Sequence, residues 1–366
     1  MSLTVGIVGL PNVGKTTLFN ALTASQAETA NYPFTTTESN IGIAALSDQR
    51  LDELDAMFKP RKKISATYEF YDIAGLAKGA AWGEGLGNQF LAKIREADAI
   101  CHIVRCFKDD AVTHVENSID PLRDIEIIDL ELILADLQTV ENRLSKVEKK
   151  AKAQDKEVLQ EQQLLTALKE GLASGQPAAA FTGNPQHVKM IKNWNLLTAK
   201  PLIFAANLGE EDINDYENNS FYLQVKEYAE RHGSQVIPVC AKIEAELSLL
   251  DAETRAEFMR ELGIRTAGLQ LLIQKTYELL DLATFFTVGE DEVRAWTFHL
   301  GMKAVDCAGL IHSDLARGFI KAEVYTYEDI TKYGTEAGVK EHGALRIEGR
   351  EYLVKDGDIL FIRFNV

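Results

Sequence analysis

The chain has 366 residues, of which 46% are hydrophobic and 26% charged, and this composition excludes disordered and fibrous proteins. Its 55 acidic residues against 39 basic ones give a net charge of −16, so bulk nucleic acid and anionic membranes should repel it. No apolar run approaches the roughly 20 residues of a membrane helix. We expect a soluble, cytoplasmic and monomeric protein without membrane association.

The apolar stretch 3–10 is short, lacks a preceding basic segment and leads directly into a glycine motif. It is therefore predicted to be a buried strand and not a signal peptide. The four cysteines form no C-x-x-C pair, which favours reduced thiols in a cytoplasmic core; they are Cys101, Cys106, Cys240 and Cys307.

Strand-like and helix-like segments alternate along residues 1–120, and the same pattern resumes over 201–281. This alternation predicts one nucleotide-binding α/β domain with a mostly parallel sheet, interrupted by an insertion. The predicted strands are 3–9, 68–73, 99–107, 201–207 and 235–240, with helices from Lys15 and over 221–231.

Residues 121–200 lack strand signals and carry leucines, valines and alanines mostly three or four apart. They predict an inserted pair of antiparallel helices, with seams at Leu130, Leu134, Leu137, Leu144, Val147 and Ala151, then at Leu164, Leu168 and Leu172. The tip, 141–157, has six basic and four acidic side chains. It is either a solvated helical face or a local contact with a polyanion such as RNA.

The last 85 residues, 282–366, change to short strands and turns and predict a small α+β domain. Predicted strands are 284–288, 293–298, 319–324, 345–347 and 359–364. Its 14 acidic and 10 basic side chains give 10 − 14 = −4, which argues against a general RNA clamp.

Residues 9–16 satisfy G-x-x-x-x-G-K-[ST] between a predicted strand and a predicted helix, which is the context of a phosphate-binding P-loop. Main-chain N–H groups and the helix N-terminus bind phosphate, Lys15 reaches the outer phosphates, and the Thr16 hydroxyl ligates Mg²⁺. The alternative is a glycine turn without a ligand. The predicted contacts are Asn12, Val13, Gly14, Lys15, Thr16 and Thr17.

Asp72 ends a predicted strand and begins D-x-x-G, so it can hold the metal while Gly75 approaches the γ-phosphate. The polar loop 31–37 offers a threonine to the same Mg²⁺, and spacing does not choose among Thr35, Thr36 and Thr37.

These segments, together with the run 83–90, resemble the YchF proteins, also called Obg-like ATPases, of the Obg branch of P-loop GTPases. The resemblance covers essentially the whole chain. It implies a P-loop NTPase G domain with an inserted antiparallel helical hairpin and a TGS-like C-terminal domain. It also implies Thr36 as the switch-I metal ligand, and the ribosome or a translation factor as partner.

The segment 207–210 stands where guanine-specific relatives carry N-K-x-D, but it has no lysine and ends in Glu210. Guanine selectivity should weaken, and the resemblance implies that ATP is hydrolysed in preference to GTP. Asn207, Leu208 and Glu210 are expected beside the base, with Cys240 and Ala241 on its other side. The alternative is a turn that leads into a helix.

Leu76 follows D-x-x-G, where a glutamine often orients the attacking water, and it has no hydrogen-bonding group. His114 is the best substitute in the chain, and the resemblance points to the same residue. The alternative is that His114 is structural or idle, as a lone loop histidine more often is. The glycine-rich segment 75–87 is interpreted as switch II, against a passive surface loop.

The leading hypothesis is a cytoplasmic ATPase in which nucleotide reshapes two switch loops and so changes partner binding. Basic residues 59–63 and the hairpin tip are candidate RNA contacts. A GTP-specific switch and a nucleotide-stabilised scaffold remain as rivals, with a metabolic kinase less well supported.

Overall fold

The computed structural model describes residues 3–24, 41–72, 86–150 and 156–365, without the side chains of residues 72, 86–90 and 150. The chain divides into two units. Thr4–Gly42 and Glu69–Leu272 form what we call the P-loop unit. Met1–Leu3, Ile43–Tyr68 and Ile273–Val366 form the C-terminal unit.

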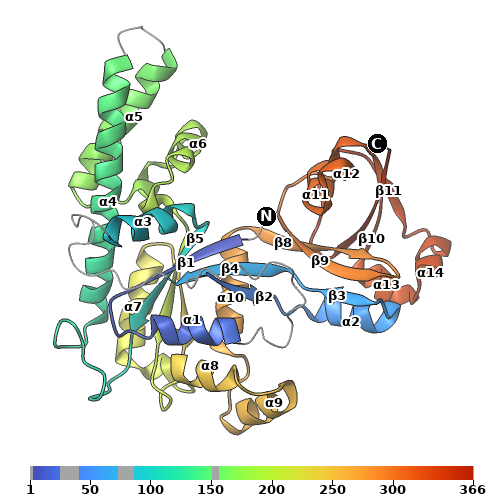
Figure 1. Cartoon of the computed structure of the whole chain (residues 1–366), viewed down its shortest axis with the longest axis horizontal. Coiled ribbons are helices and arrows are strands. Elements are labelled where there is room, and N and C mark those ends of the chain that lie inside the picture. Colours follow the sequence, from blue (N-terminus) through green and yellow to red (C-terminus); the bar gives the residue numbers. More distant parts are fainter. Residues whose placement is uncertain (1–2, 25–40, 73–85, 151–155, 366) are drawn as a thin grey trace. The chain divides into compact units, whose positions relative to one another are not determined.

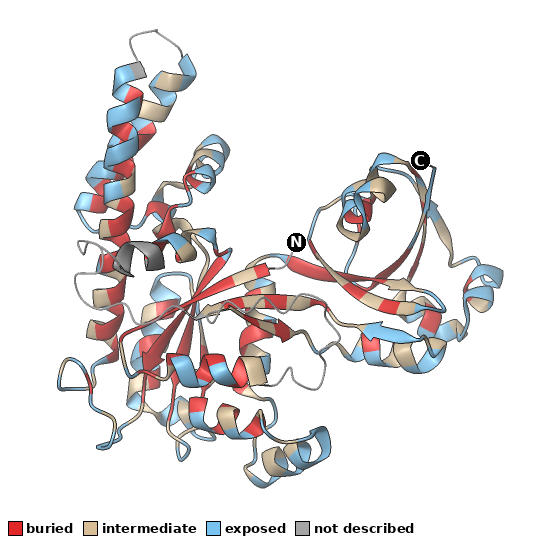
Figure 2. Ribbon diagram, viewed as in Figure 1, coloured by how far each residue is buried: buried red, intermediate tan, exposed pale blue. Residues whose placement is uncertain are grey.

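The first sheet has the strand order β2-β4-β1-β5-β6-β7. Strands β1, β5, β6 and β7 pair in parallel, as the sequence predicts. Every residue of β5 is buried, which is typical of a parallel strand covered by helices on both faces (Figures 1 and 2). The strands are β1 (Leu3–Val8), β2 (Ile41–Ala45), β4 (Thr67–Asp72), β5 (Ala99–Arg105), β6 (Leu202–Asn207) and β7 (Gln235–Val239).

The helices of this part of the chain begin at recognisable caps. The Asn219 side chain accepts the N–H groups of Phe221 and Tyr222, and Asn184 caps a helix that begins with Pro185. No helix of the described ranges is long and apolar enough to cross a membrane. The helices are α1 (Lys15–Ala24), α3 (Leu86–Glu96), α4 (Pro121–Lys150), α5 (Lys156–Ala173), α6 (Pro185–Asn193), α7 (Ser220–Arg231), α8 (Ala241–Leu247), α9 (Ala252–Glu261) and α10 (Gly268–Leu279).

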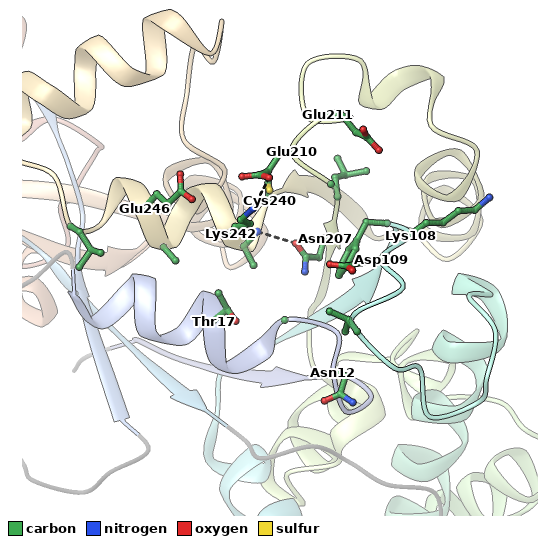
Figure 3. A pocket seen from close by; sticks show the side chains of 18 residues that line it. Asn12, Thr17, Lys108, Asp109, Asn207, Glu210, Glu211, Cys240, Lys242 and Glu246 are labelled. Carbon is green, nitrogen blue, oxygen red and sulfur yellow. Dashed lines mark hydrogen bonds and ion pairs between the residues drawn. The ribbon is translucent and has the colours of Figure 1, made fainter.

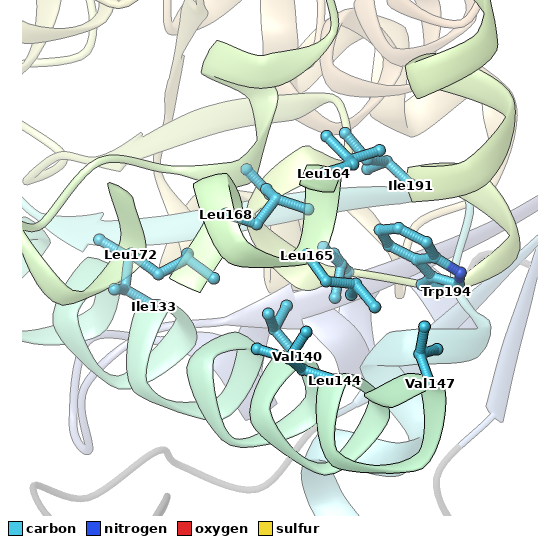
Figure 4. Packing of buried hydrophobic residues seen from close by; sticks show 12 residues of the cluster. Ile133, Val140, Leu144, Val147, Leu164, Leu165, Leu168, Leu172, Ile191 and Trp194 are labelled. Atoms are coloured by element: carbon cyan, nitrogen blue, oxygen red, sulfur yellow. The ribbon is translucent and has the colours of Figure 1, made fainter. Parts of the chain in front are cut away.

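Helices α4 and α5 pack side by side, as predicted for the insertion (Figure 4). The predicted seam was wrong at Leu130, which is exposed. The seam of α4 uses a heptad spacing of four and three, and α5 contributes the predicted leucines. The α4 residues are Ile133, Leu137, Val140, Leu144 and Val147, facing Leu164, Leu168 and Leu172. Trp194 and Ile191 close the same cluster.

Replacing Leu168 with alanine is expected to lower the free energy of unfolding by about 2–5 kcal/mol, because it leaves a cavity between the helices. Leu168 is completely buried, whereas Leu159 on the same helix is exposed. Urea denaturation of both alanine variants tests this. Leu159→Ala should change stability by no more than about 0.5 kcal/mol; equal losses would contradict the assigned seam.

The C-terminal unit contains a mixed sheet of order β11-β10-β12-β8-β9-β3. Helices α11 and α12 pack in one core cluster, and α2, α13 and α14 in a second. The strands are β3 (Lys62–Ile64), β8 (Leu282–Val288), β9 (Glu292–His299), β10 (Phe319–Thr326), β11 (Arg346–Glu348) and β12 (Asp358–Phe364). The helices are α2 (Gln49–Phe58), α11 (Ala304–Ile311), α12 (Ser313–Arg317), α13 (Tyr327–Tyr333) and α14 (Glu336–Glu341).

Residues 43–68 lie with the C-terminal unit, although the sequence analysis grouped them with the nucleotide-binding segments. Strand β3 pairs with β9, and Leu51 and Leu54 are buried against Phe286. Arg50 also bonds to Asp356 at 2.7 Å. In the basic run 59–63, Arg61 pairs with Asp291 and Lys63 with Asp52.

Candidate functional site

The loop between β1 and α1 has the backbone of a phosphate-binding loop. Gly9, Asn12 and Gly14 have φ values of 150°, 63° and 100°, and the Leu18 N–H bonds to the Gly14 carbonyl where α1 begins. Lys15 is buried, and its ammonium group donates to the Leu10 carbonyl. The main chain therefore curls over the N-terminus of a helix, which is the arrangement that binds anions.

Asn207 joins this loop to the start of α8. Its Nδ2 donates to the Val13 carbonyl at 2.8 Å, and its Oδ1 accepts the Ala241 N–H at 2.9 Å. The side chain is buried, so both bonds are shielded from water. Asn207 thus holds together two segments that are more than 200 residues apart in sequence.

A pocket of about 890 Å³ opens beside Asn207, at the carboxyl ends of the parallel strands (Figure 3). Such an edge is where open α/β sheets bind ligands, and the volume suits a nucleotide. Four segments line it: Asn12, Gly14 and Thr17; Phe107, Lys108, Asp109 and Val112; residues 207–211; and Cys240, Ala241, Lys242, Ala245, Glu246 and Leu249.

Arg105 organises the pocket wall that follows β5, which consists of residues 107–109 and Val112. Arg105 is 1% exposed, and its guanidinium donates to the carbonyls of Phe107, Val112 and Asp109, at 3.2, 2.8 and 3.1 Å. It also lies over the Phe107 ring. Burial lowers the pKa of Arg105, and the negative charges of Asp109 and Asp124 oppose that shift. The wall therefore depends on one buried cation.

Replacing Arg105 with methionine should lower the free energy of unfolding by about 3 kcal/mol or more, because three carbonyls lose their donor. The loosened wall should also weaken ADP binding about tenfold. Calorimetry and thermal melting test both effects. Arg317→Met, at an exposed arginine paired with Asp314, is the control. Unchanged ADP affinity in the Arg105 variant would contradict the assignment.

His114 lies just beyond this wall and is buried. Its Nδ1 accepts the Glu116 N–H at 3.1 Å, so the ring proton sits on Nε2 and faces Asp124 at 2.8 Å. Arg123 bonds to the other oxygen of Asp124 at 2.9 Å. Both ring nitrogens of His114 thus have protein partners, and one of these bonds must open before the ring can bind a water.

On the opposite side, Glu210 and Lys242 form an ion pair of 2.8 Å. Leu208 donates its N–H to the Val239 carbonyl, which joins the ends of β6 and β7. Burial raises the pKa of the Cys240 thiol, and nearby N–H groups oppose that shift. A neutral thiol and apolar neighbours therefore form much of this side of the pocket.

The structure brings eight predicted binding residues to the pocket: Asn12, Gly14, Thr17, Asn207, Leu208, Glu210, Cys240 and Ala241. Val13, Lys15 and Thr16 belong to the adjoining loop and first turn of α1, outside the lining. Thr36, Gly75 and Leu76 lie outside the described residues, as does the side chain of Asp72 at the end of β4.

Sequence motifs missed the wall that follows β5 and the part of α8 that lines the pocket. The missed α8 residues are Ala245 and Glu246, with Leu249 beyond the helix. The one available signal was position: a loop after a predicted parallel strand lies at the ligand-binding edge.

Of the predicted Mg²⁺ ligands, only the side chain of Thr16 is described, and its hydroxyl fits the ion chemically. Thr16 is exposed in the first turn of α1, and hydroxyl and carboxylate oxygens are the ligands that Mg²⁺ prefers. Among the described side chains, no group of three or more histidines, cysteines or acids is placed so that it could hold a metal ion. Thr16 would hold the ion, which would neutralise charge on the phosphates.

Comparison with known proteins agrees with this architecture. Residues 4–169 match a model described as a 50S ribosome-binding GTPase, and residues 282–365 match the YchF-GTPase C-terminal model, described as a protein of unknown function. The chain is 52% identical to the ribosome-binding ATPase YchF of Bacillus subtilis and 47% identical to that of Escherichia coli O157:H7, each over the full length of both chains. The structure of the Schizosaccharomyces pombe YchF GTPase superposes with a TM-score of 0.88 at 36% identity, covering 99% of this chain and 98% of that one.

Proposed function

The chain belongs to the YchF family, and from this premise we propose that it is a Mg²⁺-dependent nucleoside triphosphatase that hydrolyses ATP in preference to GTP. We further propose that it acts as a nucleotide-controlled switch on the ribosome in the cytoplasm. The bond cleaved would be the β–γ phosphoanhydride. Thr16, Thr36 and Asp72 would hold Mg²⁺, and Gly75 would approach the γ-phosphate.

One observation supports this proposal most strongly: Asn207 bonds at once to the P-loop carbonyl of Val13 and to Ala241, beside a nucleotide-sized pocket. The phosphate-binding loop and the base-side segments thus converge on one cavity. Relatives carry the names ribosome-binding ATPase and GTPase, so the nucleotide preference is a matter for measurement.

Competition between ATP and GTP for the purified protein, with and without Mg²⁺ and with and without ribosomes, tests the proposal. We expect ATP to outcompete GTP, Mg²⁺-dependent phosphate release, and co-sedimentation with ribosomes that changes with the bound nucleotide. Preference for GTP would support a GTP-specific switch instead. Binding without turnover in the presence of ribosomes would support a nucleotide-stabilised scaffold.

We propose that His114 orients the attacking water, since Leu76 has no group for this task. Replacing His114 with alanine should lower turnover about tenfold or more while ADP affinity changes little. Single-turnover hydrolysis and calorimetry separate the two effects. Unchanged turnover would remove His114 from the mechanism, and a parallel loss of ADP affinity would indicate a structural role beside Asp124.

A further inference from the structure

The base side of the pocket contains one ion pair that the proposed hydrolysis does not use. Lys242 lies in the first turn of α8, and Glu210 lies in the loop after β6. The Lys242 ammonium donates to the Glu210 carboxylate at 2.8 Å, and both side chains line the pocket (Figure 3). The ion pair therefore connects two walls of the cavity.

We infer that Lys242 is a specificity-determining residue: it holds the carboxylate of Glu210 in an ion pair, withholds that acceptor from guanine, and so favours adenine. This inference rests on the proposed nucleotide-binding function of the pocket. It assigns a role to a lysine and does not follow from the replacement of aspartate by glutamate alone.

The chemistry of the two bases makes the state of this carboxylate decisive. Guanine presents two adjacent donors, at N1 and at the N2 amino group, and a free carboxylate accepts both. Adenine has a ring acceptor where guanine has the N1 donor, so it gains no such pair. A carboxylate with one oxygen bound to an ammonium keeps only one unengaged oxygen, and the ammonium partly neutralises its charge. The two donors of guanine therefore gain less from the paired carboxylate of Glu210 than from a free one.

Some of the neighbouring acceptors are already engaged. The side-chain Oδ1 of Asn207 already accepts the Ala241 N–H, and an Asp109 side-chain oxygen accepts the Ala111 N–H at 2.8 Å. Glu211 and Glu246 are the remaining carboxylates of the lining. The hydrogen bond from Lys242 to Glu210 raises the pKa of Lys242, so the ammonium stays charged at neutral pH.

The expected change in nucleotide preference is set by how exposed the Lys242–Glu210 ion pair is. The side chains of Lys242 and Glu210 are 68% and 47% exposed, and ion pairs at such positions change equilibria by at most about fivefold. Lys242→Met should therefore raise the affinity for GDP relative to ADP by about two- to fivefold. Using the ratio of the two dissociation constants cancels the effect of the lost charge on the phosphates, which both ligands share.

The experiment is calorimetry of ADP and GDP binding to the full-length protein and to five variants. These are Lys242→Met, Lys242→Arg, Glu210→Gln, the double variant with Met and Gln, and Lys169→Met. Lys169 forms an exposed ion pair of 3.0 Å with Glu141 in the helical hairpin, so Lys169→Met is a matched control away from the pocket. Lys242→Arg and Lys169→Met should keep the wild-type ratio.

The inference is supported if Lys242→Met shifts the ratio toward GDP and the same substitution has no effect when Glu210 is glutamine. It is overturned if the ratio stays constant, or if the shift persists without the Glu210 charge, which would implicate Glu211 or Glu246. A wild-type protein that binds neither ADP nor GDP would instead remove the proposed function. Wild-type ADP binding with an unchanged ratio in Lys242→Met would leave that function intact and remove only this inference.

Discussion

The Gly14→Ala variant is expected to bind ADP at least about a hundredfold more weakly than the wild type. Gly14 has a φ of 100°, which side chains with a Cβ adopt only with strain. An added Cβ would also collide with the Asn207 amide nitrogen and lie 3.4 Å from the Ala241 Cβ. Overpacking of about 1–3 kcal/mol, added to the backbone strain, gives roughly two orders of magnitude.

Gly175 provides a matched control for this experiment. Its φ of 86° carries a similar strain, but an added Cβ there has no neighbour within 4 Å. Gly175→Ala should therefore retain ADP binding, and the difference between the variants isolates the collision with Asn207. Calorimetry measures binding, and circular dichroism checks that both variants fold. Wild-type affinity in Gly14→Ala would show that the loop rearranges freely and would contradict the geometry described above.

The Lys15→Met variant is expected to lose about 10²–10³-fold in the rate of ATP hydrolysis. The Lys15 side chain is buried within the P-loop, and we propose that its charge stabilises the negative charge that develops on the outer phosphates. Methionine keeps a stem of similar length without the charge, so packing is preserved. Phosphate release under single-turnover conditions with Mg²⁺ measures the loss.

Lys189→Met, at an exposed lysine of α6, is the control for the Lys15 variant and should leave hydrolysis unchanged. If Lys15→Met hydrolyses ATP at the wild-type rate, the observed turnover does not arise at this P-loop. Loss of hydrolysis in both variants would indicate a general defect of the preparation. The comparison therefore separates chemistry at the loop from the removal of any one positive charge.

The spacing of residue types along the sequence was enough to predict the P-loop and most strands of the first sheet. Glycines at 9 and 14 placed the P-loop, and alternating apolar runs placed β1, β5, β6 and β7 within one or two residues. These features depend on neighbours in the chain, because backbone conformation and amphipathic period are local properties. The helical insertion was predictable for the same reason, although the exposed Leu130 shows that the exact seam was not.

Only the tertiary structure decided which distant residues meet. Packing placed Leu51 and Leu54 against Phe286, and it joined Asn207 to both Val13 and Ala241. It also paired Glu210 with Lys242, and buried the Arg105 guanidinium beneath the pocket wall.

None of these contacts can be recognised from the spacing of residues along the sequence. Hydrogen bonds and ion pairs form between whichever groups the folded chain brings within about 3 Å. The sequence alone therefore determined that a phosphate-binding loop exists and where it begins. The tertiary structure decided which carbonyls, amides and charges surround it, since burial selects partners by position in space and not along the chain.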